Sequence, residues 1–506
     1  MNIIKDCIME FSFNKLQFND SEKFGVLFLS DTKKLPSFLK SSAKLITETL
    51  EMFENFSCKF GEILVTTIEI NGEIKRFLFC GTGEANKLSR VKIQKLGGNI
   101  ADKLNSLKVC KAAIFIDNEE LKDQEDFFIE NICEGIKLKN YVFDKYYVDK
   151  KDKHKIFLEK INVYSNSLNV EKIFSMREKI INSTHFVRDL VSEPGNVLNP
   201  DSFVLVCKDL EKLGVKVKVI DKKSLKELGM NAILAVGQGS DFGTFAISME
   251  WNGDESSNKN DKPIAFIGKG VTFDTGGINL KPSGPSITMM KYDMGGAAVV
   301  TGLIKSLAER KAKINVVGVI GLAENMPSSS AQRPGDVITS MSGQTIEVDN
   351  TDAEGRLLLA DVMWYAQENF KPKIMIDLAT LTGAIVIALG HHNAGIFSND
   401  DDLVKRLHQA GEEVGERVWR LPLDEFYDDL INSNIADVRN IGKGGAGSIT
   451  AAQFLKRFVQ KDCAWAHIDI AGVNWLDDGG DCSPKGATGY GVRLLNEFLI
   501  KNYEKK

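Results

Sequence analysis

Several signatures of common enzyme classes are missing from this chain. Histidine is scarce, and none of the six histidines forms the HExxH pattern of zincin-type proteases. The chain also lacks the G-x-S-x-G elbow of serine hydrolases and the GxxxxGK[ST] loop that binds nucleotide phosphates. The glycine-rich stretch 442–447 (GKGGAG) has the wrong order for a phosphate loop, so we expect a flexible loop that caps or borders a site.

Long apolar runs and paired cysteines are absent as well. No run approaches the roughly 18 apolar residues of a membrane span, and 384–389 (AIVIAL) fits a buried strand or a helix segment. The N-terminal MNIIKDCIMEFSF has no unbroken apolar stretch of the kind found in a secretory signal. The eight cysteines are scattered without a CxxC pair. We therefore expect reduced thiols in a cytoplasmic protein.

No excess of positive charge is present. The formal net charge is −5 at pH 7, which gives the whole chain no electrostatic reason to bind nucleic acid or an anionic membrane.

The length of 506 residues exceeds what one hydrophobic core supports, so we expect two domains. In the first third, strand-like runs at 25–30, 60–70, 76–81 and 112–117 alternate with a helix-like run at 38–56, which predicts an α/β domain. The charged stretch 141–165, with a lysine-rich run read as a solvated linker, ends this domain. An amphipathic connecting helix follows at about 170–194. The predicted limits are an N-terminal domain at 1–166, a connecting helix at 167–192 and a catalytic domain at 193–506.

The remaining chain predicts a larger α/β domain with a mainly parallel central sheet flanked by helices. Its strand-like runs are 215–221, 263–268, 314–323, 373–379 and 465–472.

Residues that can carry chemistry gather in three segments of this second domain. The first, 267–283, runs from an apolar strand into a glycine-rich turn that holds Lys269, Asp274 and Lys281. Ligands of open α/β sheets bind at the carboxyl ends of strands, where this turn lies. The second, 289–300, places Asp293 before Gly295 and Gly296, which let the backbone approach a bound group.

The third segment, 349–361, spaces Asp352, Glu354 and Arg356 by two residues. In an extended segment this spacing would point all three side chains to one side. Together the three segments bring four carboxylates to one place, where they would repel each other strongly. Bound divalent cations resolve such repulsion, and oxygen-rich ligands suit Mg²⁺, Mn²⁺ or Zn²⁺. Two such cations can share a bridging carboxylate and a bridging water.

These segments resemble those of the leucyl (cytosol) aminopeptidase family. The octapeptide 350–357 (NTDAEGRL) matches the signature of that family, and 268–283 and 293–298 match its other metal-site segments. Further similar stretches are 377–384, 465–472 and 485–495. The resemblance covers roughly residues 190–500 and is vague in the first third, where the family carries a variable, macro-like α/β domain.

The resemblance implies a role for each site residue. Asp274 and Glu354 would bridge two metals, Lys269 and Asp293 would complete the tighter site, and Asp352 would complete the exchangeable one. The expected metals are two divalent ions per subunit, Mn or Zn, with Mg or Co as further candidates for the exchangeable site. Lys269 would ligate as the neutral amine. A hydroxide bridging both ions would attack the peptide.

The catalytic residues implied in the same way are Lys281 and Arg356. Lys281 would polarise the scissile carbonyl. Arg356 would hold a bicarbonate that acts as general base. The free α-amine of the substrate would bind one metal, which restricts cleavage to the N-terminus.

The resemblance also implies a first side-chain pocket that favours leucine and methionine, and a homohexamer acting on peptide substrates. The residues that align with this pocket are Met290, Thr380, Leu381, Gly383 and Ala487.

Simpler interpretations exist for each residue taken alone. Asp352 and Glu354 could be first-turn acids of the helix that follows, and Asp293 could be a helix cap. Lysines are surface residues by default, Met290 fits a core position, and His467 fits a buried core histidine. The combination of three motifs favours the functional interpretation.

Two other functions compete with an aminopeptidase. A two-metal phosphoesterase or nuclease would use the same carboxylates, but the octapeptide and the absence of a basic channel argue against it. A second role as a DNA-binding accessory protein is known in the family, but the net charge does not support it.

Overall fold

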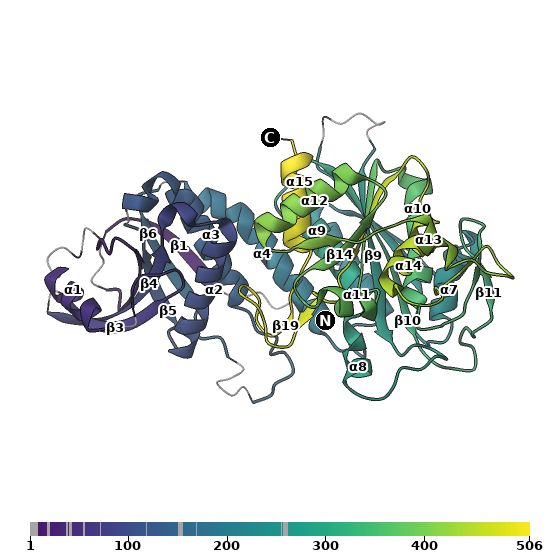
Figure 1. The fold of residues 1–506 in the computed structure, drawn as a ribbon, viewed down its shortest axis with the longest axis horizontal. Coiled ribbons are helices and arrows are strands. Elements are labelled where there is room, and N and C mark those ends of the chain that lie inside the picture. Colours follow the sequence, from purple (N-terminus) through teal and green to yellow (C-terminus); the bar gives the residue numbers. More distant parts are fainter. Residues whose placement is uncertain are drawn as a thin grey trace. The chain divides into compact units, whose positions relative to one another are not determined.

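The computed structural model describes residues 9–17, 21–36, 39, 43–53, 56–70, 72–117, 119–149, 155–167, 169–254, 256 and 262–505. The described residues form two compact units, which we call the N-terminal unit (9–181 with 478–484) and the C-terminal unit (182–477 with 485–505). Both units are α/β, as predicted (Figure 1). The domain limits given above stay a prediction.

The N-terminal unit is built on a six-stranded sheet in the order β1-β6-β5-β2-β4-β3. Every neighbouring pair is parallel except β3 with β4. The strands are β1 (Glu10–Lys15), β2 (Phe24–Ser30), β3 (Ile63–Ile70), β4 (Glu73–Gly83), β5 (Lys111–Phe115) and β6 (Lys160–Ser165).

Helices bury both faces of this sheet. Along β2, Val26 and Phe28 join the core under α2 (Arg90–Ser106) and α3 (Glu125–Lys139). Leu27 and Leu29 join a second core with residues of α1 (Ala43–Met52). Because both faces are covered, β2 reads as a continuous apolar run.

The C-terminal unit contains an eight-stranded sheet in the order β15-β14-β17-β13-β9-β10-β8-β7. Its four central strands, β17, β13, β9 and β10, are mutually parallel, whereas β14 and β8 each pair antiparallel to this centre. The strands are β7 (Lys216–Ile220), β8 (Phe245–Asn252), β9 (Ile264–Asp274), β10 (Asn315–Asn325), β13 (Ile374–Ala379), β14 (Ala394–Ser398), β15 (Val418–Arg420) and β17 (Ala464–Asp469).

Helices cover both faces of this sheet as well. Figure 1 shows α9 (Gly295–Glu309), α12 (Asp401–Val414) and α15 (Val492–Asn502) on one side of β9, and α7 (Asn231–Gly237), α10 (Glu354–Phe370) and α14 (Gly447–Lys456) on the other. Residues of α7, α10 and α14 share one hydrophobic core with the central strands. The remaining helices of the unit are α5 (Pro200–Asp209), α6 (Lys222–Glu227), α8 (Pro285–Thr288), α11 (Gly383–Leu389) and α13 (Glu425–Asp429).

Smaller strands complete the C-terminal unit. A three-stranded sheet joins β11 (Val337–Thr339), β12 (Thr345–Glu347) and β16 (Val438–Arg439), and a two-stranded one joins β18 (Trp475–Leu476) and β19 (Gly486–Ala487). The apolar run 384–389 lies in α11, so the helical alternative is the correct one.

The predicted strands and the connecting helix are observed, and further elements are present that were not predicted. The connecting helix is α4 (Val170–Ser192), and the charged stretch 141–165 ends with β6, a strand that was not predicted. The predicted helix 38–56 is observed as α1, and parts of it lie outside the described residues. Strands β1 (Glu10–Lys15), β8, β14 and β15 were not predicted, and neither were the short strands β11, β12, β16, β18 and β19.

A short segment between β18 and β19 belongs to the N-terminal unit although its neighbours in the sequence belong to the C-terminal unit. Residues 478–484 belong to the N-terminal unit, where Lys139 Nζ donates to the carbonyl oxygens of Gly480 (2.7 Å) and Ser483 (3.1 Å). Lys95 also pairs with Asp481 at 3.0 Å. Short as it is, this segment is held by several polar contacts.

Neither a disulfide nor a membrane helix is found among the described residues. The seven cysteines in those ranges form no disulfide with one another. None of the helices in the same ranges combines the length and hydropathy that crossing a bilayer requires.

Candidate active site

A cavity of about 500 Å³ lies at the carboxyl ends of the central strands of the C-terminal unit. Its walls come from the ends of β9 and β13, the turn before α10, α11 and the glycine-rich loop before α14. All seven residues predicted as metal ligands or catalytic groups line this cavity; they are Lys269, Asp274, Lys281, Asp293, Asp352, Glu354 and Arg356. The sheet thus brings together residues that are far apart in the sequence, as expected for open α/β sheets.

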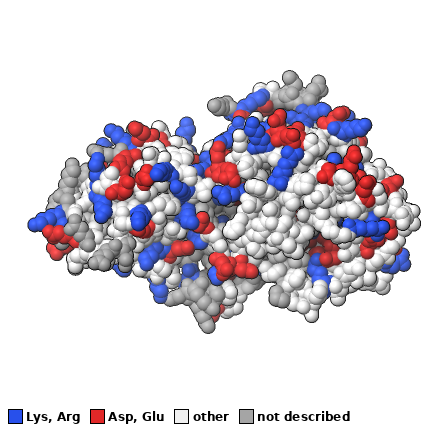
Figure 2. Space-filling view, in the orientation of Figure 1, with Lys and Arg blue, Asp and Glu red and all other residues white. Residues whose placement is uncertain are grey.

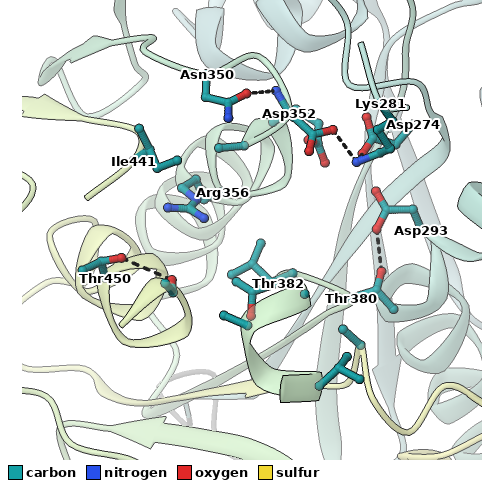
Figure 3. A pocket seen from close by; sticks show the side chains of 18 of the residues that line it. Asp274, Lys281, Asp293, Asn350, Asp352, Arg356, Thr380, Thr382, Ile441 and Thr450 are labelled. Atoms are coloured by element: carbon teal, nitrogen blue, oxygen red, sulfur yellow. Dashed lines mark hydrogen bonds and ion pairs between the residues drawn. The ribbon is translucent and has the colours of Figure 1, made fainter. Parts of the chain in front are cut away.

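One half of the cluster is organised around Lys281. Its ammonium lies 2.8 Å from Asp274 Oδ2 and also forms an ion pair with Asp352. The other carboxylate oxygen of Asp274 accepts hydrogen bonds from the backbone of Gly276 (2.9 Å) and the side chain of Asn325 (2.8 Å). Figure 3 shows Asp274, Asp352 and Lys281 gathered on one side of the cavity.

The other half is organised around Lys269, which is 3% exposed. Its ammonium lies 2.8 Å from Asp293 and 2.9 Å from Glu354 Oε1 and donates to the carbonyl of Thr380 (3.1 Å). The hydroxyl of Thr380 donates to Asp293 Oδ1 at 2.8 Å. Both carboxylates of this half are buried.

Two glycines make this arrangement possible. Gly276 has φ +87°, which a residue with a side chain rarely adopts, and a Cβ there would lie 2.7 Å from Asp352 Oδ1. Gly355, in the first turn of α10, leaves room for Lys269, because a Cβ at 355 would lie 2.5 Å from Lys269 Cε.

The third motif is not extended, so our explanation of its spacing is wrong. Asp352 lies in a turn, and α10 begins at Glu354, so Arg356 already belongs to the helix. Asp352 and Glu354 reach the same cavity because the chain turns sharply between them, with Asp352 N bonded to Asn350 Oδ1 at 2.8 Å. Gly296 also differs from expectation: it lets α9 approach the carbonyl of Leu378 in β13 rather than a bound group.

Burial and mutual repulsion shift the protonation of the cluster. Burial raises the pKa of Asp293, Asp352 and Glu354, and neighbouring carboxylates raise each pKa further. Burial lowers the pKa of Lys269 and Lys281, but the surrounding carboxylates outweigh it and raise both above the usual lysine value. The cluster therefore holds its protons more tightly than the same groups would in water.

The donor set of this cluster fits divalent cations. Carboxylate oxygens of Asp274, Asp352 and Glu354 lie within 4.8 Å of one another. Four carboxylates face two ammonium groups, which leaves an excess of negative charge. Glu354 Oε2 is buried without a hydrogen-bond partner anywhere in the described chain, so a donor oxygen is available. Oxygen ligands of this kind suit Mg²⁺, Mn²⁺ and Zn²⁺.

Arg356 is set apart from the carboxylates, near Thr450 and Ile441 (Figure 3). Its Nη1 donates to the carbonyl of Asn440 at 2.7 Å, whereas its buried Nε finds no acceptor among the described residues. Burial lowers the pKa of Arg356 to about 10, although Glu354 and Asp469 oppose this shift. A buried guanidinium with an unused N–H is suited to hold a small anion.

The predicted pocket residues divide into two groups. Met290, Thr380, Leu381 and Gly383 line the cavity. Ala487 is buried in β19 and is not among the residues that line it. The glycine-rich loop borders the cavity through Gly442, Gly444, Gly445 and Gly447, where the sequence placed it.

Sequence reasoning missed several polar residues that hold the walls. Asp469 accepts the N–H groups of Leu381 (3.1 Å) and Ala471 (3.2 Å) and the hydroxyl of Thr382 (2.6 Å). Asn440 accepts from the backbone of Asp349 at 2.9 Å and donates to that of Asn350 at 2.7 Å.

Asn325 and Tyr292 were missed as well. Asn325 and Asp469 each end an apolar strand, and that position was a signal for both. Tyr292 lines the cavity next to Asp293 and stacks on Trp475 with ring centroids 6.3 Å apart.

His467 occupies the core, as the simpler interpretation predicted. Its ring is fully buried, and Nδ1 lies 2.6 Å from Asp377 Oδ1 on the neighbouring strand. Burial lowers the pKa of His467, but the charge and hydrogen bond of Asp377 together with the charge of Asp469 outweigh burial, so the pKa is raised.

Comparison with known protein families gives two matches along the chain. Residues 185–496 match the family described as "Cytosol aminopeptidase family, catalytic domain", and residues 26–150 match its N-terminal domain. A probable cytosol aminopeptidase of Rickettsia bellii is 45% identical over 489 residues, covering 95% of this chain and 97% of that protein. One from Ehrlichia ruminantium is 49% identical over 465 residues, with 91% of each covered.

Two solved structures share the fold. A mutant of tomato leucine aminopeptidase has a TM-score of 0.84 and 30% sequence identity, covering 98% of this chain and 97% of its own. The bottromycin maturation enzyme BotP in complex with Mn has a TM-score of 0.81 and 28% identity, covering 95% and 99%. The likeness therefore extends over both units.

Proposed function

The chain belongs to the cytosol aminopeptidase family, and on that premise we propose that it removes N-terminal leucine and other apolar residues from peptides. Membership makes the chain a metal-dependent aminopeptidase. The preferred side chain and the mechanism go further and are our proposal. The observation that carries it is the cluster of Asp274, Asp293, Asp352 and Glu354 around two lysines in one cavity.

The metal ligands in this proposal are Lys269, Asp274, Asp293, Asp352 and Glu354. Asp274 and Glu354 would be shared by two divalent ions, Mn or Zn, with Mg or Co as further candidates for the site completed by Asp352. When bound, the two ions supply an activated water at neutral pH and a Lewis acid for the scissile carbonyl. BotP binds Mn in a related structure, which supports a divalent metal here.

Lys281 and Arg356 are the proposed catalytic residues. The side chain of Lys281 is 14% exposed and reaches the cavity from the loop after β9. In this proposal its cation would polarise the scissile carbonyl and stabilise the oxyanion. Arg356, with its unused Nε, would hold a bicarbonate that supplies a general base.

The lining of the cavity supports the proposed preference for leucine. Apolar side chains of Met290, Leu381, Ala384 and Val386 face it, and a leucine side chain loses water-exposed area against them. By family resemblance we also propose Ala487 as a pocket residue, although it is buried in β19 and does not line the cavity.

The proposal extends to assembly and location by family resemblance alone. We propose a homohexamer in the cytoplasm with peptides as substrates, and light scattering on the purified chain would measure the subunit number. Neither a phosphoesterase nor a DNA-binding role is favoured by a specific observation. On the face shown in Figure 2, Lys and Arg are interspersed with Asp and Glu.

The experiment that tests the function is hydrolysis of leucine p-nitroanilide with Mn²⁺ and with a chelator. We expect metal-dependent release of leucine by the wild type and its loss in Glu354→Ala. Glu368→Ala, an exposed position at the far end of α10, is the matched control and should keep wild-type activity. A folded, metal-loaded wild type that cleaves neither this substrate nor free dipeptides would refute the proposal.

A further inference from the structure

We propose that Asn325 is a positioning residue that sets the two metal-bearing loops at the distance that the ions require. The proposal rests on the function proposed above. Asn325 is the last residue of β10, is 2% exposed, and lies opposite Asp274 at the end of β9. The register of β10 with β9 shifts between Ala323 and Asn325, an irregularity of the kind that redirects side chains near active sites.

The amide group of Asn325 joins both loops. Its Nδ2 donates to Asp274 Oδ1 at 2.8 Å and to the carbonyl of Thr351 at 3.0 Å, immediately before Asp352. The reversed amide would place an oxygen against two acceptors, so only this orientation is favourable. One side chain therefore bonds to a proposed ligand of the first loop and to the backbone beside a ligand of the second.

These contacts decide which oxygen of Asp274 is free for a cation. Oδ1 accepts from Asn325 and from the backbone of Gly276 (2.9 Å), which uses its lone pairs. Oδ2 lies toward Lys281 and the rest of the cluster. Without the amide, the carboxylate of Asp274 could rotate, and its place in the cluster would no longer be fixed.

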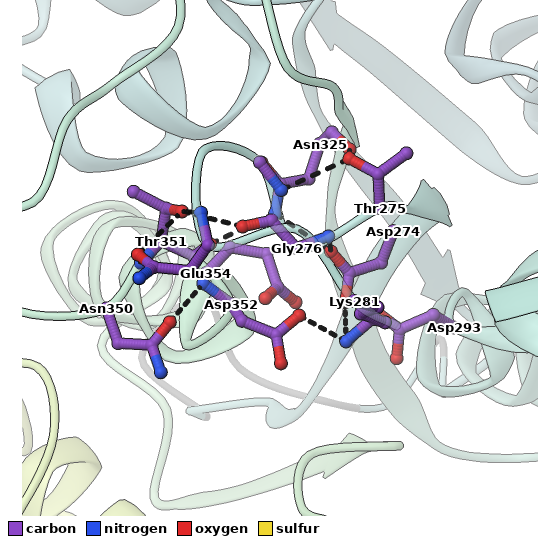
Figure 4. A network of polar contacts seen from close by, with 12 residues as sticks. Asp274, Thr275, Gly276, Lys281, Asp293, Asn325, Asn350, Thr351, Asp352 and Glu354 are labelled. Carbon is purple, nitrogen blue, oxygen red and sulfur yellow. Dashed lines mark hydrogen bonds and ion pairs between the residues drawn. The ribbon is translucent and has the colours of Figure 1, made fainter. Parts of the chain in front are cut away.

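Further hydrogen bonds make the connection rigid (Figure 4). The backbone oxygen of Asn325 accepts from Thr275 N (3.0 Å) and Oγ1 (2.8 Å). Thr351 Oγ1 donates to the carbonyl of Gly276 at 2.6 Å, and Thr351 N donates to Asn279 Oδ1 at 2.9 Å. Loop 274–281 and segment 350–354 are thus fixed to each other through Asn325 and Thr351.

Asn325 acts through Asp274 and not on the substrate. It is absent from the residues that line the cavity, and its amide faces a carboxylate. Groups that orient metal ligands typically change metal affinity roughly 10–100-fold when they are removed.

The test is titration of metal-stripped full-length protein with Mn²⁺ in a calorimeter, comparing wild type with Asn325→Ala. The matched control is Asn496→Ala in the same unit, a buried asparagine that bonds Ser306, Arg310 and Val492 between α9 and α15. We expect Asn325→Ala to bind Mn²⁺ roughly 10–100-fold more weakly. Asn496→Ala should lose comparable thermal stability but bind Mn²⁺ within about twofold of wild type, since it touches neither loop.

A kinetic measurement separates positioning from substrate binding. In Asn325→Ala, the Mn²⁺ concentration for half-maximal activity should rise, while KM for leucine p-nitroanilide at saturating Mn²⁺ stays near the wild-type value. Unchanged Mn²⁺ affinity in Asn325→Ala, or equal weakening in Asn496→Ala, would overturn the proposal. Wild type that binds Mn²⁺ but cleaves no peptide would refute the proposed function and leave the Asn325 comparison valid.

Discussion

Uncharged donors also hold the carboxylates of the cluster, beside the two lysines. Thr380 binds both members of the Lys269–Asp293 pair, donating its hydroxyl to Asp293 and accepting from Lys269 at its carbonyl. A hydrogen bond to a buried charge stabilises by about 1.5–3 kcal/mol. Replacing the hydroxyl of Thr380 by a methyl group should therefore lower the catalytic rate.

Thr380→Val keeps the shape of the side chain but leaves Asp293 Oδ1 without the 2.8 Å hydrogen bond from Thr380. We expect kcat/KM for leucine p-nitroanilide to fall roughly 10–100-fold, since 1.4 kcal/mol corresponds to a factor of ten. Thr380→Ser retains the hydroxyl and should stay within a few-fold of wild type. Equal losses in the valine and serine variants would show that packing, and not the hydrogen bond, matters at this position.

Asp361 is a second buried residue whose charge state matters, although it lies outside the cavity. Its carboxylate accepts from Ile233 N (3.0 Å) at the start of α7 and from Met341 N (2.8 Å). Burial raises the pKa of Asp361 to about 7, although these backbone donors oppose the shift. The proton is thus held more tightly in the folded state than in the unfolded state.

This pKa predicts a pH dependence of stability. The contribution of Asp361 is fully present below its unfolded pKa and is lost as pH rises through the folded value of about 7. We expect wild type to lose roughly 2–3 kcal/mol from this group between pH 5 and 7. Asp361→Asn has no such proton, so urea unfolding of both proteins at several pH values should show a flatter profile for the variant. Parallel profiles would contradict the prediction.

At the scale of the elements, the start of α10 is built around the side chain of Lys269. Gly355 lies in its first turn, where alanine would normally favour the helix by about 1 kcal/mol. A Cβ at this position, however, would lie 2.5 Å from Lys269 Cε and 2.7 Å from Nζ. Space for the lysine therefore decides the residue.

Gly355→Ala should displace the ammonium of Lys269 and lower kcat/KM by at least roughly 100-fold, a loss typical of misplaced catalytic geometry. Circular dichroism should still report a folded protein. In a Lys269→Ala background the same change should become neutral or stabilising in urea unfolding, because the clash is gone. A Gly355→Ala enzyme of wild-type activity would contradict this account.

The sequence predicted strands well where the whole strand is apolar. The central strands β9, β10, β13 and β17 read as apolar runs because helices cover both faces of the sheet. Strand β15 is a three-residue edge strand, β14 beside it has only five residues, and β6 follows a lysine-rich run, so none of the three gave a clear pattern.

The site was predicted to the extent that charge and motif mark it. The lysines, acids and arginine stand out by residue type beside glycine-rich turns. Asn325 and Asn440 do not stand out by residue type. Their hydrogen-bond partners are 51 and 90 residues away in the sequence, and only the folded arrangement of the chain brings them together. The bend before Glu354 was also missed, since alternate spacing fits an extended segment as well as a turn entering a helix.

At the scale of the whole molecule, the proposed metal ions bind to only one of the two units, and each unit has its own hydrophobic core. All proposed ligands lie in the C-terminal unit. A ligand at 100 times its Kd stabilises the state that binds it by about 2.7 kcal/mol. The N-terminal unit has its own sheet and core and gains nothing directly.

We therefore expect Mn²⁺ to slow amide hydrogen exchange in the C-terminal unit, most strongly in loop 274–281 and the first turn of α10. Exchange in the sheet of the N-terminal unit should not change. Glu354→Ala should abolish the effect. Equal protection of both units by Mn²⁺ would contradict a site confined to one of them.

The excursion of residues 478–484 into the N-terminal unit has a consequence for modularity. Neither unit is encoded by one continuous length of chain, because seven residues near the C-terminus complete the first unit. Cutting the gene near codon 181 would separate Lys139 from the carbonyls of Gly480 and Ser483 and leave both fragments with unmatched polar groups. Recombination that exchanges the N-terminal unit between relatives would therefore succeed only if residues 478–484 were exchanged together with it.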